Sequence, residues 1–222
     1  MKCPAPVLLL LLGLAGTRAA EPSAPIDLGE ELGYVRIHSS AEAEKVLGPV
    51  LRRDAALIVD LRYPTDGLAH YEMVGQLLEQ HPTGKLLFLL VSPDTPPRAV
   101  LLVQALAARS LVLGATGSWV PAQHGVLVAQ TAAADRQAYD AFETGQPAAA
   151  LIAGKIEKDR YDEAALMTDF HGGNPDPLPP AAPDTAKAKP AADGAAKPVP
   201  TDRVWQRAVH LHRALLAIPR QG

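Results

Sequence analysis

The sequence is poor in cysteine and in aromatic residues, and neither sign of charge dominates it. Its 222 residues include one cysteine, 5% aromatic residues, and 21 basic against 24 acidic side chains. A formal net charge of -3 provides no basic field to neutralise phosphates, so nucleic-acid binding is not expected. Hydrophobic residues make up 48% of the chain. That fraction is enough for a buried core, which excludes the fully disordered and fibrous classes.

The N-terminal segment has the pattern of a secretory signal peptide, which we expect to comprise residues 1–20. Lys2 precedes an apolar run over residues 7–14, and small residues follow up to Ala19 and Ala20. The run is shorter than the roughly 20 apolar residues that span a bilayer, so we predict cleavage after Ala19 or Ala20, with an uncleaved anchor as the alternative. The expected protein is therefore periplasmic or secreted, with no stable membrane span after cleavage.

The single cysteine, Cys3, lies within this segment and is removed with it. The mature chain then has no disulfide, no thiolate nucleophile and no zinc-thiolate site. The histidines also lack the spacing of metal ligands on one helix face: they are His38, His70, His81, His124, His171, His210 and His212. The last two are two positions apart, so on a helix they face different sides. We predict neither a metal nor a cofactor.

Short apolar runs alternate with longer amphipathic stretches over residues 26–170. The expected strands are 34–37, 55–61, 85–91, 111–113 and 125–128, and the expected helices are 41–50, 68–80, 98–109, 132–142 and 161–170. Ser39 or Ser40 can cap the first helix, and Glu42, three residues after Ser39, has the spacing of a capping box. Strands separated by helices predict a mostly parallel sheet in a single α/β domain.

The composition changes at residues 172–200, where Pro, Ala, Lys and Asp predominate and little can be buried. Such a composition predicts a disordered linker. Thr201 or Asp202 can then cap a terminal amphipathic helix over residues 201–218. Two adjacent apolar stripes run along it, formed by Val204, Ala208, Leu211 and Leu215 and by Trp205, Val209, His212 and Leu216. A face this broad docks on the domain or on another protein, and docking on the domain is favoured because exposed Trp and Leu are costly.

Residues 32–37, followed by an apolar strand ending in Asp60-Leu61-Arg62 and then by Gly67, resemble the opening of a known core domain. It is the core of the C-terminal processing (tail-specific) serine peptidases. The resemblance covers residues 26–128, including the strand at 86–91, the proline-rich turn after it and the short strand at 111–114. It implies the crotonase/ClpP-like fold, a superhelix of strand-strand-helix units. Assembly into rings or trimers is common in that superfamily, so the resemblance also implies a homo-oligomer.

The chain departs from this family where the catalytic residues should be. The position of the nucleophilic serine falls on Pro97, which has neither a hydroxyl to attack a carbonyl nor a backbone N–H. The loop that carries the general-base lysine corresponds to residues 114–119, which contain no lysine. The resemblance therefore implies a non-catalytic binding or scaffolding module of the cell envelope. It would hold a peptide or protein partner with the inherited groove near Gly67, Thr95 and Gly114, or with the terminal helix.

Two alternatives stay open. In the first, Ser92, Thr95 or Ser118 is the relocated nucleophile of a serine or threonine hydrolase, although a hydroxyl without a positioned base is a poor nucleophile. In the second, the chain is a catalytically dead rhodanese-like domain. Residues 60–62 after an apolar strand and residues 117–119 resemble that fold, but the cysteine that begins its active loop is absent.

Overall fold

Strands and helices alternate along the chain in the computed structural model, which describes residues 24–153 and 199–218. The strands are β1 (Ile26–Asp27), β2 (Leu32–Arg36), β3 (Ala56–Asp60), β4 (Leu87–Val91), β5 (Leu111–Ala115) and β6 (Gly125–Val128). The α-helices are α1 (Ala43–Leu51), α2 (Tyr71–Glu79), α3 (Pro97–Leu106), α4 (Ala132–Glu143), α5 (Ala148–Ile152) and α7 (Arg203–Ala217). Short 3-10 helices at Ser40–Glu42 and Ala107–Arg109 precede α1 and follow α3.

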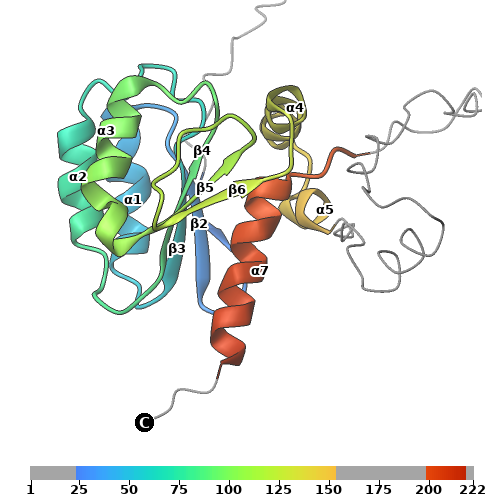
Figure 1. Ribbon diagram of the computed structural model, residues 1–222. Helices are drawn as coiled ribbons and strands as arrows, with labels where there is room; N and C mark the ends of the chain where they lie inside the picture. Colours follow the sequence, from blue (N-terminus) through green and yellow to red (C-terminus); the bar gives the residue numbers. More distant parts are fainter. Residues whose placement is uncertain (1–23, 154–198, 219–222) are drawn as a thin grey trace, which may run out of the picture.

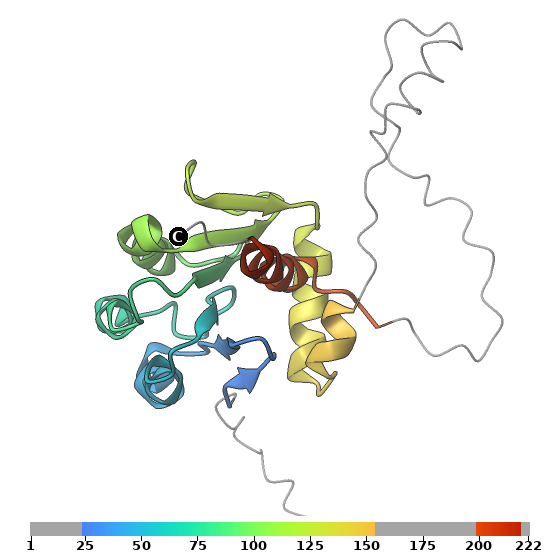
Figure 2. The same ribbon diagram turned by 90° about the horizontal axis from the view of Figure 1, so that it is seen from below.

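The six strands form one sheet in the same order as they follow along the chain. β1 pairs antiparallel with β2, whereas β2 to β6 pair in parallel. Helices α1, α2 and α3 connect successive parallel strands and lie on one side of the sheet, and α4, α5 and α7 lie on the other (Figure 1, Figure 2). The fold is therefore α/β with a mixed, mostly parallel sheet, which confirms the class predicted from the alternation of strands and helices.

The two faces of the sheet carry separate apolar cores because successive strand residues point to opposite faces. Val35, Val59 and Leu89 belong to the core beneath α1, α2 and α3. Ile58 and Phe88 belong to the core on the other face, which Leu151 of α5 and Val204, Trp205, Ala208 and Val209 of α7 complete. Burial on both faces explains why the central strands are almost continuously apolar.

The connection from β5 to β6 has no helix. It runs over residues 116–124 and turns back against the start of β6. A Cβ added at Gly125 would lie 2.3 Å from the carbonyl oxygen of Pro121 and 2.7 Å from Val120. The loop therefore takes the place of a fourth crossover helix. Only glycine at position 125 allows the loop to approach β6 so closely.

Several element boundaries differ from those expected. The helix expected at 68–80 begins at Tyr71. Leu68 has φ 57°, and this left-handed conformation cannot continue into a right-handed helix. Ser39 makes no capping hydrogen bond, so the predicted capping box is wrong. Instead Ser40 donates its N–H to Asp66 Oδ2 at 2.8 Å, and its hydroxyl bonds the same oxygen. The sequence pattern also missed the short elements β1 and α5.

The expected terminal helix is α7, and Asp202 rather than Thr201 caps it by accepting a hydrogen bond from the N–H of Trp205 at 2.9 Å. The expected signal peptide, the helix at 161–170 and nearly all of the linker at 172–200 lie outside the described residues. Across residues 24–153 and 199–218, no helix is long and apolar enough to span a membrane.

Candidate functional site

The three residues proposed from the sequence to line a groove lie at the carboxyl-terminal side of the sheet. Gly67 is in the turn after β3 and has φ +61°, Thr95 is in the turn after β4, and Gly114 is the fourth residue of β5. Ligands of parallel α/β sheets bind at this edge, because loops from successive strands meet there. None of the three residues lines either of the cavities described below.

The hydroxyls of Ser92 and Thr95 tie the turn after β4 to the chain that follows β3. Ser92 Oγ donates to the carbonyl oxygen of Arg62 at 3.0 Å, and Thr95 Oγ1 lies 3.4 Å from the same oxygen. Thr95 Oγ1 also accepts from the backbone N–H of Ser92 at 2.7 Å. None of these bonds joins a hydroxyl to an imidazole or an amine, so none prepares a nucleophile by removing its proton. Their geometry is that of a turn.

Ser118 packs directly on Gly114. A Cβ added at Gly114 would lie 2.5 Å from Ser118 Cβ and 3.0 Å from Val91 Cγ2, so position 114 requires glycine for close approach. Ser118 is 8% exposed, and its Oγ has no hydrogen-bond partner among the described residues. Pro97 is the first residue of α3, so a proline occupies the helix start at which the resemblance places the nucleophile.

A network of buried charges, which the sequence did not reveal, lies beside these turns. Its centre is the guanidinium of Arg62, which binds three aspartates. Arg62 Nη2 lies 2.7 Å from Asp60 Oδ2 and 2.8 Å from Asp202 Oδ2, and Nη1 lies 2.8 Å from Asp135 Oδ1. All four side chains are 0% exposed. The network joins β3, α4 and the start of α7, and Asp135 and Asp202 lie 73 and 140 residues from Arg62 along the chain.

Burial and the charge of Arg62 act against each other on the aspartates, and the balance lowers the pKa of Asp60 but raises that of Asp135. Burial alone would raise the pKa of Asp60, but Arg62 and Arg36 outweigh burial and lower it to about 2. Burial raises the pKa of Asp135, and Arg62 offsets this effect only in part. Burial would lower the pKa of Arg62, yet Asp202 and Asp60 raise it well above its ordinary value. Arg62 therefore stays charged, with Asp60 as its ionised partner.

A second arginine extends the network toward β2. Arg36 Nε donates to the hydroxyl of Tyr34 at 3.0 Å, and that hydroxyl donates to Asp60 at 2.7 Å. The guanidinium stacks on Tyr139, 3.6 Å from the ring centroid, and Nη1 forms an ion pair with Glu143. Arg36 Nη2 has no partner within the described part of the chain. Because Arg36 is only 1% exposed, the network holds elements together, and of these side chains it is Glu143, at 32% exposed, that reaches solvent.

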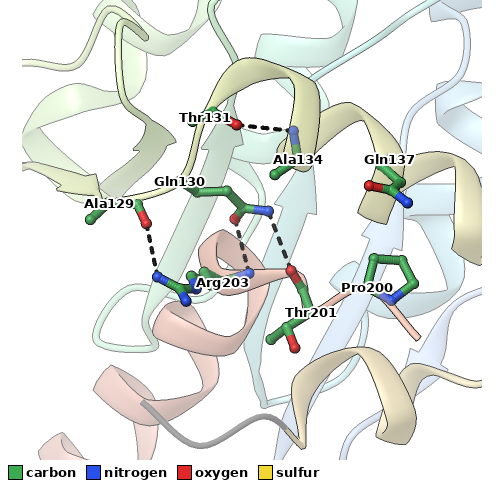
Figure 3. A pocket seen from close by; sticks show the side chains of 8 residues that line it. All are labelled: Ala129, Gln130, Thr131, Ala134, Gln137, Pro200, Thr201 and Arg203. Carbon is green, nitrogen blue, oxygen red and sulfur yellow. Dashed lines mark hydrogen bonds between the residues drawn. The ribbon is translucent and has the colours of Figure 1, made fainter. Parts of the chain in front are cut away.

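A cavity of about 420 Å³ lies where the segment after β6 meets the start of α7 (Figure 3). Its lining residues are Ala129, Gln130, Thr131, Ala134, Gln137, Pro200, Thr201 and Arg203. Gln130 Oε1 accepts from the N–H groups of Arg203 at 3.0 Å and Val204 at 3.3 Å, and Gln130 Nε2 donates to the carbonyl of Thr201 at 3.3 Å. The first N–H groups of α7 are thus satisfied internally, and they are not free to bind an anion.

A second cavity of about 480 Å³ lies along α1 and is lined by Ala41, Glu44, Lys45, Gly48, Pro49 and Arg52. Neither cavity is lined by a nucleophile paired with a general base. Among the residues that the structure describes, no group of three or more His, Cys, Asp or Glu side chains is placed to hold a metal ion.

The outer edge of the sheet carries an exposed apolar surface. β6 is the last strand in the order, and Leu127 on it is 58% exposed, whereas Trp119 in the loop before it is 42% exposed. Val112 donates its N–H to the carbonyl of His124 at 2.8 Å. In a parallel ladder that pairing directs the backbone groups of alternate residues toward β5, so those of Gly125 and Leu127 point outward. An uncharged edge with exposed large side chains can accept another strand.

Sequence reasoning missed the partners of Arg62 but not Arg62 itself. The motif Asp60-Leu61-Arg62 was the basis of the family resemblance, and Asp202 was expected as a helix cap. The available signal for a buried ion pair was the spacing of Asp60 and Arg62. They are two positions apart at the end of an apolar strand, so both side chains lie on the same buried face. Comparison with known proteins adds no further guide: no family model, curated protein or solved structure matches the chain.

Proposed function

We propose that the protein is an exported, non-catalytic binding or scaffolding module of the cell envelope, related to the crotonase-like core of tail-specific peptidases. The observation that carries the proposal is the chemistry at the start of α3. Pro97 begins α3 at the position where the resemblance places the nucleophile, and residues 114–119 contain no lysine. The neighbouring hydroxyls of Ser92 and Thr95 are bound to a backbone carbonyl. A site without a nucleophile or a base binds without reacting.

The partner is a peptide or protein that contacts the loop at 116–124 and the edge of β6. Gly114, one of the residues first assigned to the groove, lies beneath the beginning of this loop through its contact with Ser118. Trp119 and Leu127 provide the exposed apolar contacts. The outward backbone groups of Gly125 and Leu127 provide hydrogen bonds to an extended peptide, which gives affinity by strand addition.

A fluorophosphonate probe tests the absence of catalysis. We expect the purified protein to remain unlabelled under conditions in which a known serine hydrolase is labelled completely. The alternative, a hydrolase with a relocated nucleophile, predicts labelling that disappears in one of three variants: Ser92→Ala, Thr95→Ala or Ser118→Ala. Such site-specific labelling would overturn the proposal.

Photocrosslinking in the cell tests the binding surface. A photoreactive residue at Leu127 is expected to capture a partner protein, whereas the same residue at Leu101 serves as the matched control. Leu101 is similarly exposed, at 47%, but lies on α3 rather than on the sheet edge. Equal capture at the two positions would contradict the assignment of the surface, because it would indicate collision rather than docking.

Fractionation tests export independently of binding. The full chain is expected in the envelope or medium fraction at the mass of a chain lacking residues 1–20. A variant with Leu10→Arg, which interrupts the apolar run, is expected to remain inside the cell at its full mass. Full-mass protein in the cytoplasm for both chains would rule out the proposed location.

A further inference from the structure

Helix α7 binds the sheet as a separate ligand would, through contacts with residues far away in sequence. Trp205 is 0% exposed and stacks on Tyr34 with ring centroids 3.9 Å apart, and its ring also meets the edge of Phe142 at 5.4 Å. His212 Nε2 lies 2.8 Å from the carbonyl oxygen of Glu30. We call the residues that receive the helix the α7 slot: Glu30, Tyr34, Arg62, Gln130, Phe142 and Leu151.

Polar contacts fix the register of the helix within the α7 slot. Asp202 caps α7 and at the same time binds Arg62 through both carboxylate oxygens, at 3.2 and 2.8 Å. Gln130 accepts from the first two N–H groups of α7. A helix that lacks an aspartate at its start, or a tryptophan three residues later, would leave Arg62 short of one partner and the stacking position beside Tyr34 empty.

The covalent tether does not determine which slot α7 enters. Residues 154–198 lie outside the described structure, and these 45 residues are all that connects α5 to the segment before α7. The two ends of that connection lie side by side, because the N–H of Asp202 donates to the carbonyl of Leu151 at 2.9 Å. A connection of this length reaches up to roughly 150 Å when extended. It is therefore long enough to deliver α7 to the slot of a neighbouring molecule.

We propose that the α7 slot is an exchangeable helix-binding site, and that its second occupant is α7 of another copy of this chain. In the exchanged dimer each copy supplies Asp202 and Trp205 to the other, and every contact of α7 is retained. The occupant is a second copy because only a helix with this register of aspartate, tryptophan and histidine reproduces all of those contacts. The exchange does not depend on the proposed function.

The balance between the two forms depends on concentration. Both contain the same contacts, so the single chain is favoured only by its tether, which holds α7 at an effective concentration on the order of millimolar. Single chains dominate at micromolar protein. Exchanged dimers accumulate as the protein concentration approaches the millimolar range, as happens when many copies gather in a confined compartment.

A crosslinking experiment with full-length chains tests the exchange. Glu30 and Arg213 are about half exposed and form an ion pair at 3.0 Å across the edge of the slot. Chains with Cys3→Ala and Glu30→Cys are unfolded together with chains carrying Cys3→Ala and Arg213→Cys, refolded at about 500 μM, and treated with a short bismaleimide. We expect a covalent heterodimer whose yield rises at least fivefold between about 10 and 500 μM protein.

Two controls make a negative result informative. A single chain with both Glu30→Cys and Arg213→Cys crosslinks internally, which shows that the reagent spans the pair. Replacing the Arg213→Cys chain by one with Arg136→Cys, an exposed position on α4, measures random collisions. If the Glu30→Cys and Arg213→Cys mixture gives no more heterodimer than this collision control at any concentration, while the internal crosslink forms, the proposal is overturned.

A peptide provides a second measurement that needs no exchange between two folded chains. A synthetic peptide of residues 199–222 with Arg213→Cys, added to the full chain carrying Cys3→Ala and Glu30→Cys, is expected to crosslink as its concentration approaches the millimolar range. The same peptide with Trp205→Ala is expected to crosslink at least tenfold less. Equal crosslinking of the two peptides would show that the slot does not recognise α7, and it would reject the proposal.

Discussion

Arg62 is the residue on which most of the buried polar structure depends. It is surrounded by Asp60, Asp135 and Asp202, and all four side chains are 0% exposed. We predict that Arg62→Met lowers the free energy of unfolding by 3–5 kcal/mol or more, roughly the cost of leaving a buried charge without its partner. Because small domains have only about 5–15 kcal/mol in total, the variant should be close to unfolding, as urea denaturation followed by circular dichroism would show.

Arg136→Met is the matched control for this prediction. Arg136 also pairs with an aspartate, Asp140, but the two side chains are 54% and 50% exposed. An exposed pair one helical turn apart contributes about 0.3–0.5 kcal/mol, so this variant should unfold at nearly the same urea concentration as the parent. A similar loss in both variants would mean that burial does not set the strength of these ion pairs.

Acid should weaken the fold through Asp60. Its pKa is lowered to about 2, below the ordinary value of 3.8, so its contribution to stability is complete above about pH 4 and lost as the pH falls toward 2. Over this window the loss is roughly 2 kcal/mol. Asp135 acts in the opposite sense: its raised pKa favours the folded state at low pH, and that contribution fades as the pH rises through its folded value.

Urea unfolding measured at intervals between pH 2 and 5 checks this behaviour. We expect Asp60→Asn to be less stable than the parent at pH 5, because Arg62 and Arg36 lose their ionised partner. The variant should then lose less stability than the parent between pH 4 and 2. Parallel curves for the two proteins would show that another carboxyl group controls the acid response.

Gly114 tests the close packing beneath the loop after β5. An alanine there would place Cβ 2.5 Å from Ser118 Cβ and 2.8 Å from Ser118 Oγ. We predict that Gly114→Ala lowers the unfolding free energy by about 1–3 kcal/mol, and that adding Ser118→Gly restores most of the loss. Gly48→Ala in α1 meets no atom within 4 Å apart from its chain neighbours and the helix backbone, but residue 48 precedes Pro49, so it should change the unfolding free energy by less than about 1 kcal/mol. Chemical denaturation of the three variants checks these effects, and the absence of rescue would argue against the contact.

At the scale of elements, the sequence predicts best where the hydrophobic period is strong. The apolar stripes beginning at Val204 and Trp205 predict α7 and its docking, and both residues are fully buried. The same stripes extend to Leu215 and Leu216, which are 40% and 54% exposed, because the helix continues past the sheet. Short elements such as α5 have too few residues for a period to be recognised. The start of α2 depends on the left-handed conformation of Leu68, which composition does not indicate.

The docking of α7 can be followed by fluorescence, because the chain has two tryptophans with different exposure. Trp205 is 0% exposed, and Trp119 is 42% exposed. In the Trp119→Phe variant the emission comes from Trp205, and we predict that it lies at short wavelength and is quenched weakly by acrylamide. In the Trp205→Phe variant it comes from Trp119, and we predict that it lies at long wavelength and is quenched strongly. Emission of the Trp119→Phe variant should shift to the red in a single step on unfolding. Strong quenching of Trp205 in the native protein would mean that α7 is not docked.

At the scale of the whole molecule, the α/β class follows from local patterns, but the charge network does not. Asp60 and Arg62 are two residues apart, and their role as neighbours on a buried face follows from strand geometry. Asp135 and Asp202 lie 73 and 140 residues from Arg62. A single sequence contains no signal that joins residues so far apart. The groove expected near Gly67, Thr95 and Gly114 was inferred from resemblance, and a resemblance does not specify which hydroxyls form hydrogen bonds within the turns.

The two faces of the sheet differ in how they are covered, and we therefore expect the fold to depend on α7. Helices α1 to α3 cover one face within the continuous chain, whereas the other depends on α7. Removing residues 201–222 would uncover Tyr34, Phe88 and Leu90 and take Asp202 from Arg62. We predict that this truncated chain binds a hydrophobic dye, scatters light as aggregates and unfolds at a lower urea concentration.

A chain ending at residue 214 separates the buried part of α7 from its exposed end. It loses Leu215, Leu216 and Ile218, which are 40%, 54% and 60% exposed, but keeps Asp202, Trp205 and His212. We expect it to unfold at nearly the same urea concentration as the full chain and to bind no more dye. The chain ending at residue 200 could also stay monomeric and bind no more dye than the full chain. In that case the face of the sheet under α7 does not need this helix, and the apolar contacts of Trp205 contribute little to the fold. Aggregation of the chain ending at residue 200, but not of the chain ending at residue 214, would show that the first three turns of α7 are enough to cover this face of the sheet.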